Sequence, residues 1–210
     1  MNNNQFFAEI IQGNLSEWTG QCWKWDEMPQ FGSLVVTTHA NLQIFGIVHT
    51  ITTGSMDPIR AVTAYQKTEE ELLRDQPQIF EFLQTTFTCI TVGYQEQQKM
   101  LYHLPEKPPK IHAFIGNPTA TQYQQFFASD QFLHLLFNLS TQGINLDELL
   151  LALLKQLHAK KILNKTKFYD FIETFSMLYK HDYQRLKIFL KRTNHVFGLD
   201  PRPEPETLVE

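Results

Sequence analysis

The stretch Phe45–Arg60, FGIVHTITTGSMDPIR, decides how the rest of the chain is interpreted. Its apolar, β-branched first half favours a strand. The glycine that follows, Gly54, favours a turn. Asp57, Pro58 and Arg60 then begin a second extended segment, in which Arg60 either pairs with an acidic residue or binds an anion. We therefore expect a hairpin with its turn at Gly54 and a structured corner at Asp57, Pro58 and Arg60.

Gly46 interrupts a run that would otherwise be a strong strand. A glycine in such a place has one of two causes. Either its backbone takes a conformation closed to other residues, or a neighbouring group approaches its bare Cα. In both cases Gly46 is required for folding rather than for a reaction, so Gly46→Val is predicted to unfold the protein.

Short β-type segments surround this stretch, with glycines 32, 46, 54 and 93 as candidate corners. Residues 1–12 have the pattern of a short amphipathic helix. Five or six short strands predict a small β-barrel, which leaves few exposed strand edges. The expected strands are 18–25, 31–38, 42–52, 60–66, 85–94 and 111–115.

One helical insert interrupts the β-type pattern. Thr68 and Glu71 form a T-x-x-E capping box, which predicts the start of a helix. Pro77 fits the first position of a second helical turn.

The order of these features resembles a HAS-barrel domain, the N-terminal barrel of HerA-type ATPases and of the ATP synthase catalytic and non-catalytic subunits. Stand-alone proteins of this kind occur in cyanobacteria. The resemblance covers about residues 28–116 and implies a barrel used for assembly and for docking partners. The chain contains no G-x-x-x-x-G-K-[ST] motif, so the resemblance does not carry over an ATPase activity. The positions that carry it are Phe45-Gly46-Ile47-Val48, Gly54, Arg60, Thr68–Glu71, Gln76-Pro77 and Gly93.

The second half of the chain has helical periodicity. Apolar residues recur at helical spacing over 121–138, 165–179 and 182–193, and Asn145 with Glu148 caps a further helix rich in leucine. The fold class is therefore α+β: a small N-terminal β-barrel with a helical insert, followed by a C-terminal helical bundle. The expected domains are an extension with the first strand (1–27), a HAS-like barrel (28–118), a helical domain (119–197) and a disordered tail (198–210).

Charge is distributed unevenly along the chain. Residues 1–150 carry a net charge of −8, and residues 151–210 carry +4. The basic segment either meets phosphates or an acidic protein, or is simply a solvated face with cations at helix ends. The candidate face for a polar partner consists of Lys160, Lys161, Lys165, Lys167, Arg185, Lys187, Lys191 and Arg192.

No motif for catalysis, a metal or a cofactor is present. The histidines do not cluster, G-x-S-x-G is absent, and Cys22 and Cys89 sit in apolar runs typical of reduced core residues. The apolar stretches are too short to span a bilayer, and the N-terminus does not have the pattern of a signal peptide. We expect a soluble, cytoplasmic protein that is not an enzyme and has no cofactor. An unrecognised enzyme is the weaker alternative, and it would require a pocket with titrating groups.

These observations favour a non-enzymatic adaptor or assembly module that binds a protein partner, or itself, through the barrel and the helices. The alternative is a nucleic-acid-processing accessory factor that acts with a HerA-type ATPase through the basic C-terminal helices.

Overall fold

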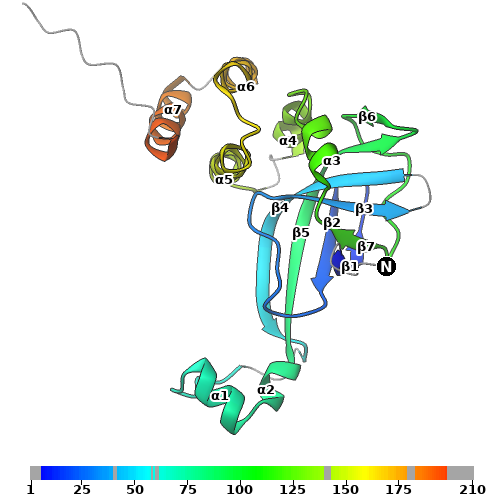
Figure 1. Ribbon diagram of the computed structural model, residues 1–210, viewed down its shortest axis with the longest axis vertical. Coiled ribbons are helices and arrows are strands. Elements are labelled where there is room, and N and C mark those ends of the chain that lie inside the picture. The colour runs from blue at the N-terminus through cyan, green and yellow to red at the C-terminus, as the bar shows by residue number, and fades with distance from the viewer. Residues whose placement is uncertain are drawn as a thin grey trace, which may run out of the picture.

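The computed structural model describes residues 6–39, 42–57, 59, 62–139, 143–178 and 183–197 (Figure 1). The side chains of residues 139, 165 and 194–197 are not described. Pro58, Arg60 and the segment 198–210, for which the sequence predicts a corner and a disordered tail, lie outside the described residues.

Six strands of the described chain close into an antiparallel barrel in the order β1-β7-β3-β4-β5-β2, and pairing of β2 with β5 joins the two ends of the sheet. The short strand β6 (Lys99–Leu101) extends the sheet beside β5. The prediction of a small N-terminal β-barrel combined with helices, a mixed α+β fold, is confirmed. The barrel strands are β1 (Phe6–Gly13), β2 (Glu17–Cys22), β3 (Leu34–His39), β4 (Leu42–Ser55), β5 (Leu83–Glu96) and β7 (Phe114–Gly116).

Three expectations for individual segments are wrong. The segment 6–13 is strand β1 rather than a helix, because Ala8 and Ile10 alternate into the barrel interior. Residues 62–66 form no strand and pair with no strand of the described chain. Gly54 lies within β4, opposite Gln84 of β5, and not in a turn. The barrel thus begins at Phe6, within the segment 1–27 that the sequence placed ahead of it.

The barrel has an apolar interior and a second apolar surface outside. Its interior holds Ala8, Ile10, Trp18, Cys22, Val35, Val48, Phe87, Cys89 and Ile115. Alternate residues of the same strands point outward, so Phe45 and Ile47 flank the inward-facing Gly46 and Val48. Cys22 and Cys89 are free and buried, which confirms their prediction as reduced core residues.

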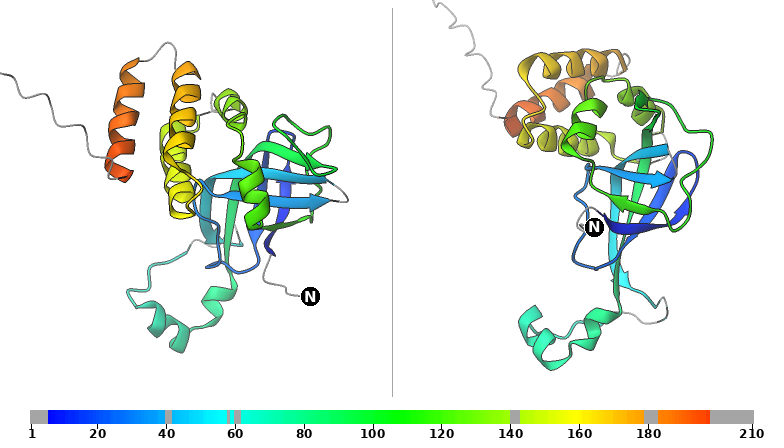
Figure 2. Two further views of the ribbon diagram at one scale, coloured as in Figure 1. Left: turned by 45° about the horizontal axis from the view of Figure 1, so that its top comes forward. Right: turned by 45° about the vertical axis from the view of Figure 1, so that its right-hand side comes forward.

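Helices cover the outer apolar surface. Figure 2 shows α3 to α7 gathered along one side of the barrel. The ring of Phe45 on β4 lies 5.3 Å from that of Phe126 on α3, and Gln156 of α5 donates a hydrogen bond to the carbonyl oxygen of Phe31 at 2.9 Å. One apolar cluster therefore runs from the barrel wall to Phe189 of α7. The helices are α3 (Ala120–Phe126), α4 (Phe132–Leu139), α5 (Leu146–Ala159), α6 (Lys165–Leu178) and α7 (Tyr183–Phe197).

The helix predicted over 121–138 is two helices. α3 ends at Phe126, and α4 begins at Phe132. The two helices let Phe126, Phe127 and Phe132 pack around one another, with ring centroids 5.0 to 5.5 Å apart. The predicted cap of α5 is confirmed, because the Asn145 side chain accepts a hydrogen bond from the backbone N–H of Glu148.

Candidate interaction surfaces

A helical arm projects from one end of the barrel. The arm comprises Met56–Phe82, of which residues 56, 57, 59 and 62–82 are described, and it contains helices α1 (Glu69–Asp75) and α2 (Gln78–Glu81). It connects β4 to β5, both of which are 14 residues long, and lies clear of the other helices (Figure 1). The predicted capping box of α1 is present, because Thr68 and Glu71 satisfy each other's backbone N–H groups.

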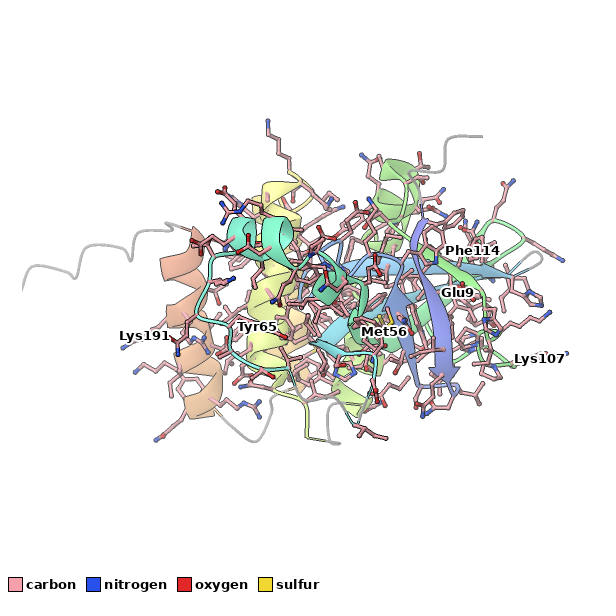
Figure 3. All side chains as sticks on the ribbon, turned by 90° about the horizontal axis from the view of Figure 1, so that it is seen from below. Glu9, Met56, Tyr65, Lys107, Phe114 and Lys191 are labelled. Carbon is pink, nitrogen blue, oxygen red and sulfur yellow. The ribbon has the colours of Figure 1, made fainter. Side chains whose placement is uncertain are left out.

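The arm exposes apolar side chains and buries few. Neither α1 nor α2 contains a buried residue. Ile59 is 93% exposed and Val62 is 62% exposed. Leaving large apolar side chains in water is unfavourable, and clusters of them mark interaction sites. The exposed apolar residues of the arm are Met56, Ile59, Val62, Tyr65, Leu73 and Phe82, and Figure 3 labels Met56 and Tyr65.

The base of the arm is fixed to the barrel. The backbone N–H of Met56 donates to the carbonyl oxygen of Phe82 at 2.8 Å, which holds the two chain segments together where they leave the sheet. The ring of Phe80 stacks on Trp25 with centroids 5.7 Å apart. Beside this base, Val62, Tyr65 and Phe82 help to line a hollow of about 250 Å³. The arm therefore presents an apolar surface with a hollow, and its base is attached to the barrel.

The arm is also acidic. Over residues 56–82 the sequence has six acidic and three basic residues. Glu69, Glu70 and Glu71 occupy the first turn of α1, where the helix dipole favours negative charge. Hydrogen bonds from Arg74 and then Lys67 hold the pKa of Asp75 below its usual value. The three glutamates of the first turn therefore place negative charge at the start of α1.

The residues predicted at the corner occupy different places. Gly46 is inside β4, facing the barrel interior, and Gly54 is near the end of β4, where the strand approaches the arm. Asp57 begins the arm: its side chain accepts the backbone N–H of Ile59 at 2.9 Å, and its own N–H donates to Ser55 Oγ at 3.1 Å. Asp57 thus makes hydrogen bonds near the start of the arm, whereas Pro58 and Arg60 of the predicted turn lie outside the described residues.

Two of the predicted basic residues interact with α3. The ammonium of Lys160 lies 5.0 Å from the centroid of the Tyr123 ring, a cation–π contact. Lys167 Nζ donates to the carbonyl oxygen of Phe127, the C-cap of α3, at 3.4 Å. Both cations therefore join the end of one helix to another.

Two more of these residues fasten α7 to α5. Arg185 pairs with Asp147 at 2.8 Å, and Arg192 pairs with Glu148 at 2.6 Å. Asp147 and Glu148 lie in the first turn of α5. The basic residues of α7 on this side therefore face acidic partners in the same chain.

The remaining predicted basic residues do not form one patch. Lys187 and Lys191 are exposed on α7, and Lys161 is exposed just after α5. The side chain of Lys165 is not described. The seven of these residues whose side chains are described thus lie in small groups with different surroundings.

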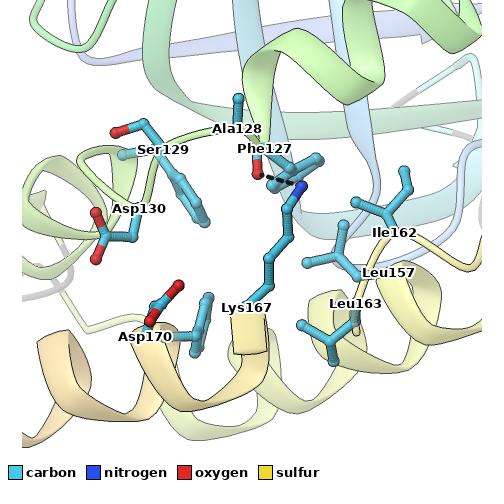
Figure 4. Close-up of a pocket in the computed structure, with 11 residues that line it drawn as sticks. Phe127, Ala128, Ser129, Asp130, Leu157, Ile162, Leu163, Lys167 and Asp170 are labelled. Atoms are coloured by element: carbon cyan, nitrogen blue, oxygen red, sulfur yellow. Dashed lines mark hydrogen bonds between the residues drawn. The ribbon is translucent and has the colours of Figure 1, made fainter. Parts of the chain in front are cut away.

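A pocket of about 350 Å³ lies between α6, the end of α3 and the loop after α5 (Figure 4). Its wall is apolar, and Lys167 extends into it toward the Phe127 carbonyl. Asp130 and Asp170 add carboxylates at its rim. Asp130 also accepts a hydrogen bond from the Thr174 hydroxyl. Because its polar groups already tie helices together, we assign this pocket a structural role.

A larger hollow of about 830 Å³ lies between the barrel and the helices. Trp23 and Met28 line it from the barrel side, and Tyr123, Gln156 and Lys160 line it from α3 and the α5 end. Sequence reasoning missed this hollow because its walls come from segments far apart in the chain.

One buried histidine has a carboxylate partner. The side chain of His49 is 8% exposed, and its Nε2 lies 2.8 Å from Glu17 Oε1. Burial lowers the pKa of His49, and Glu17 raises it in part. Burial also raises the pKa of the Cys22 thiol to about 11 and that of Cys89 well above its usual value. Among the described residues, no group of three or more His, Cys, Asp or Glu is placed to hold a metal ion.

The fold defines a class of architecture: a closed six-stranded β-barrel that carries helices on its outer wall and a helical arm at one end. No protein-family model matches the sequence, and no curated protein is similar enough to count as a relative. Within the described part of the chain, no helix is both long and apolar enough to cross a membrane.

Proposed function

We propose that this protein is an adaptor or assembly module that binds a protein partner, with the arm as its main docking surface. The observation that carries the proposal is the arm itself, whose two helices bury no residue and whose apolar side chains face water. Covering such a surface with a partner is favourable by about 25 cal/mol for each Å² of apolar area removed from water.

The barrel serves in this proposal as the rigid mount for the arm. Its closed six-stranded architecture supports the resemblance to HAS barrels, for which an assembly and docking role is expected. The helices α3 to α7 form the second element of the module, a helical domain attached to the barrel wall through a shared apolar core.

We further propose a non-enzymatic, cytoplasmic protein without a cofactor. This part rests on the sequence, in which no nucleotide-binding, metal or nucleophile motif occurs. The alternative, a nucleic-acid accessory factor that acts with a HerA-type ATPase, depends on Lys161, Lys187 and Lys191. Four other basic residues of the candidate face already interact with groups of this chain.

The test is capture of partners on the immobilised full chain from an extract of its native cell. The wild type is compared with Val62→Asp/Leu73→Asp, two exposed arm positions, and with Ile111→Asp, an equally apolar exposed position in the loop before β7. We expect one or more proteins to bind the wild type and the Ile111 variant at a fixed ratio, and the arm variant to lose them. Equal capture by all three would refute the arm as the docking surface.

A further inference from the structure

We infer that the arm of one copy docks on the outer face of α7 of a second copy, so that the protein self-associates through two different surfaces. The inference rests on the proposed function and names the partner as the same chain. It is built on two exposed surfaces that each combine apolar and charged side chains and are opposite in charge.

The first surface is the arm. Val62 and Leu73 are exposed apolar residues, and Glu69, Glu70 and Glu71 begin α1. Burial of apolar area supplies the affinity of such a contact, and the carboxylates favour a partner surface with positive charge.

The second surface is the face of α7 that points away from the helical core. Phe189 and Thr193 are buried on the inner side of α7. At 3.6 residues per turn, Lys187 and Lys191 lie together on the opposite side, with Tyr183 on one flank and Ile188 on the other. Tyr183 is 76% exposed and Ile188 is 60% exposed. We call these four residues the α7 face, and Figure 3 labels Lys191.

The charge of the α7 face is opposite to that of the arm. Helix α7 contains four basic residues and no Asp or Glu. Arg185 and Arg192 pair with Asp147 and Glu148 on the side toward α5, which leaves Lys187 and Lys191 directed outward with the exposed Tyr183 and Ile188. Two lysines flanked by two exposed apolar side chains match a surface that combines glutamates with exposed apolar residues.

The occupant must come from another molecule. The arm leaves the barrel at one end, and α7 lies beyond α5 among the other helices, apart from the arm (Figures 1 and 2). Contact of arm with arm would bring the glutamates of two α1 helices together, which is unfavourable. A second copy that presents its α7 face to the arm satisfies both the apolar and the charged groups.

Each copy then has one arm and one α7 face to offer. Two copies can exchange both contacts in a two-fold dimer, or successive copies can make one contact each in a ring or a chain.

The experiment is sedimentation velocity on the purified full chain over a wide range of concentration. It compares the wild type, the arm variant Val62→Asp/Leu73→Asp, a face variant Tyr183→Asp/Ile188→Asp and the control Ile111→Asp. Circular dichroism and thermal melting establish that each variant is folded. We expect the wild type and the control to form dimers or larger species, and each of the other two variants to be monomeric alone.

A mixture of the arm variant and the face variant tests whether the arm of one copy contacts the α7 face of another. An equimolar mixture of the arm and face variants contains one intact arm and one intact α7 face per pair, so it should form a dimer that grows no further. Dimers of the face variant alone would indicate contact of arm with arm and would overturn the inference. Loss of assembly in the Ile111 control would also overturn it, because the effect would then not be specific to the two surfaces.

A wild type that stays monomeric at every concentration overturns the inference. In that case the capture experiment separates it from the proposed function. Capture of a different protein that depends on the arm would leave the adaptor proposal standing. Capture that is unchanged by the arm substitutions would refute both the adaptor proposal and the self-association proposal.

Discussion

A Cβ atom on Gly46 would lie 2.6 Å from Cζ2 of Trp18, whose indole fills the barrel beside it, and 2.8 Å from the Cβ of Cys89. The backbone of Gly46 is not in the left-handed region, which Gly32, Gly93 and Gly143 occupy. Of the two causes that the sequence left open, close approach is therefore the one found. The absence of a side chain at Gly46 leaves the room that the indole of Trp18 occupies.

We predict that Gly46→Ala destabilises the protein and that Gly46→Val does so more. Overpacking a close-packed core costs about 1–3 kcal/mol. Each kcal/mol lowers the melting temperature of a chain of this size by about 2–4 °C. Thermal melts of the two variants beside the wild type measure the effect.

Gly54→Ala is the matched control, because no atom lies within 4 Å of the Cβ position in this strand glycine. We expect its melting temperature to equal that of the wild type or to exceed it slightly, since alanine restricts the unfolded chain. If Gly46→Val melted with the wild type, the position assigned to Trp18 would be wrong.

The two capping boxes should respond differently to the same substitution. Thr68→Ala and Thr119→Ala each remove an N-cap, which typically costs about 0.5–2 kcal/mol of helix stability. Helix α3 buries Tyr123 and Phe126, so Thr119→Ala should lower the free energy of global unfolding. Helix α1 buries nothing, so Thr68→Ala should leave global stability unchanged and speed amide exchange within 69–75 only.

Chemical denaturation and hydrogen exchange with mass spectrometry measure the two effects. A drop in global stability for Thr68→Ala equal to that for Thr119→Ala would show that the arm packs on the rest of the protein, contrary to the exposure of its side chains.

His49 should make the protein less stable in mild acid. Burial lowers its pKa below the ordinary value of about 6.5, so the unfolded chain binds the proton first as pH falls. Its contribution to the free energy of unfolding is therefore complete above that value and decreases as pH falls below it. Denaturation of the wild type and His49→Gln between about pH 7.5 and about pH 5 should show a smaller loss for the variant.

A His49 variant with an unchanged pH profile would contradict the burial of this side chain.

Binding to nucleic acid should be weak. Lys160, Lys167, Arg185 and Arg192 interact with groups of this chain, so few basic side chains remain to release counterions from a phosphate backbone. Fluorescence anisotropy with labelled DNA at increasing salt should give a shallow dependence of affinity on salt. Tight binding that falls steeply with salt, and that Lys187→Gln/Lys191→Gln abolishes, would favour the accessory-factor hypothesis instead.

Features set by neighbouring residues were predictable from the sequence. The strand around Phe45, the capping box at Thr68 and the cap at Asn145 each depend on a few adjacent side chains, and the structure has all three. Their causes, β-branched packing and satisfaction of the first helical N–H groups, operate within one turn or strand.

Features set by distant pairing were not predictable. Val62, Ala64 and Tyr65 have the alternation of a strand, but no strand of the described chain pairs with residues 62–66. Likewise, the aromatic residues from Phe126 to Phe132 fit one helix on periodicity alone, and only their packing with one another divides it.

The interaction surfaces were predictable only in part. The basic residues were visible, but their partners Asp147, Glu148 and Tyr123 belong to other helices, and no spacing in the sequence reveals those contacts. One signal in the sequence could have revealed the arm. Its capping box predicts a helix, but that helix has no apolar stripe with which to pack against the protein.

The pairing of β1 with β7 has a consequence for how the protein is made. Ala8 pairs with Ile115, so β1 is synthesised long before its neighbour β7. Contacts between residues so far apart in sequence form slowly, because a long loop must close before they contribute any stability. During translation one edge of β1 is therefore without its partner until β7 has been added, and we expect closure of this strand pair, rather than formation of the helices, to limit the rate at which the barrel becomes native.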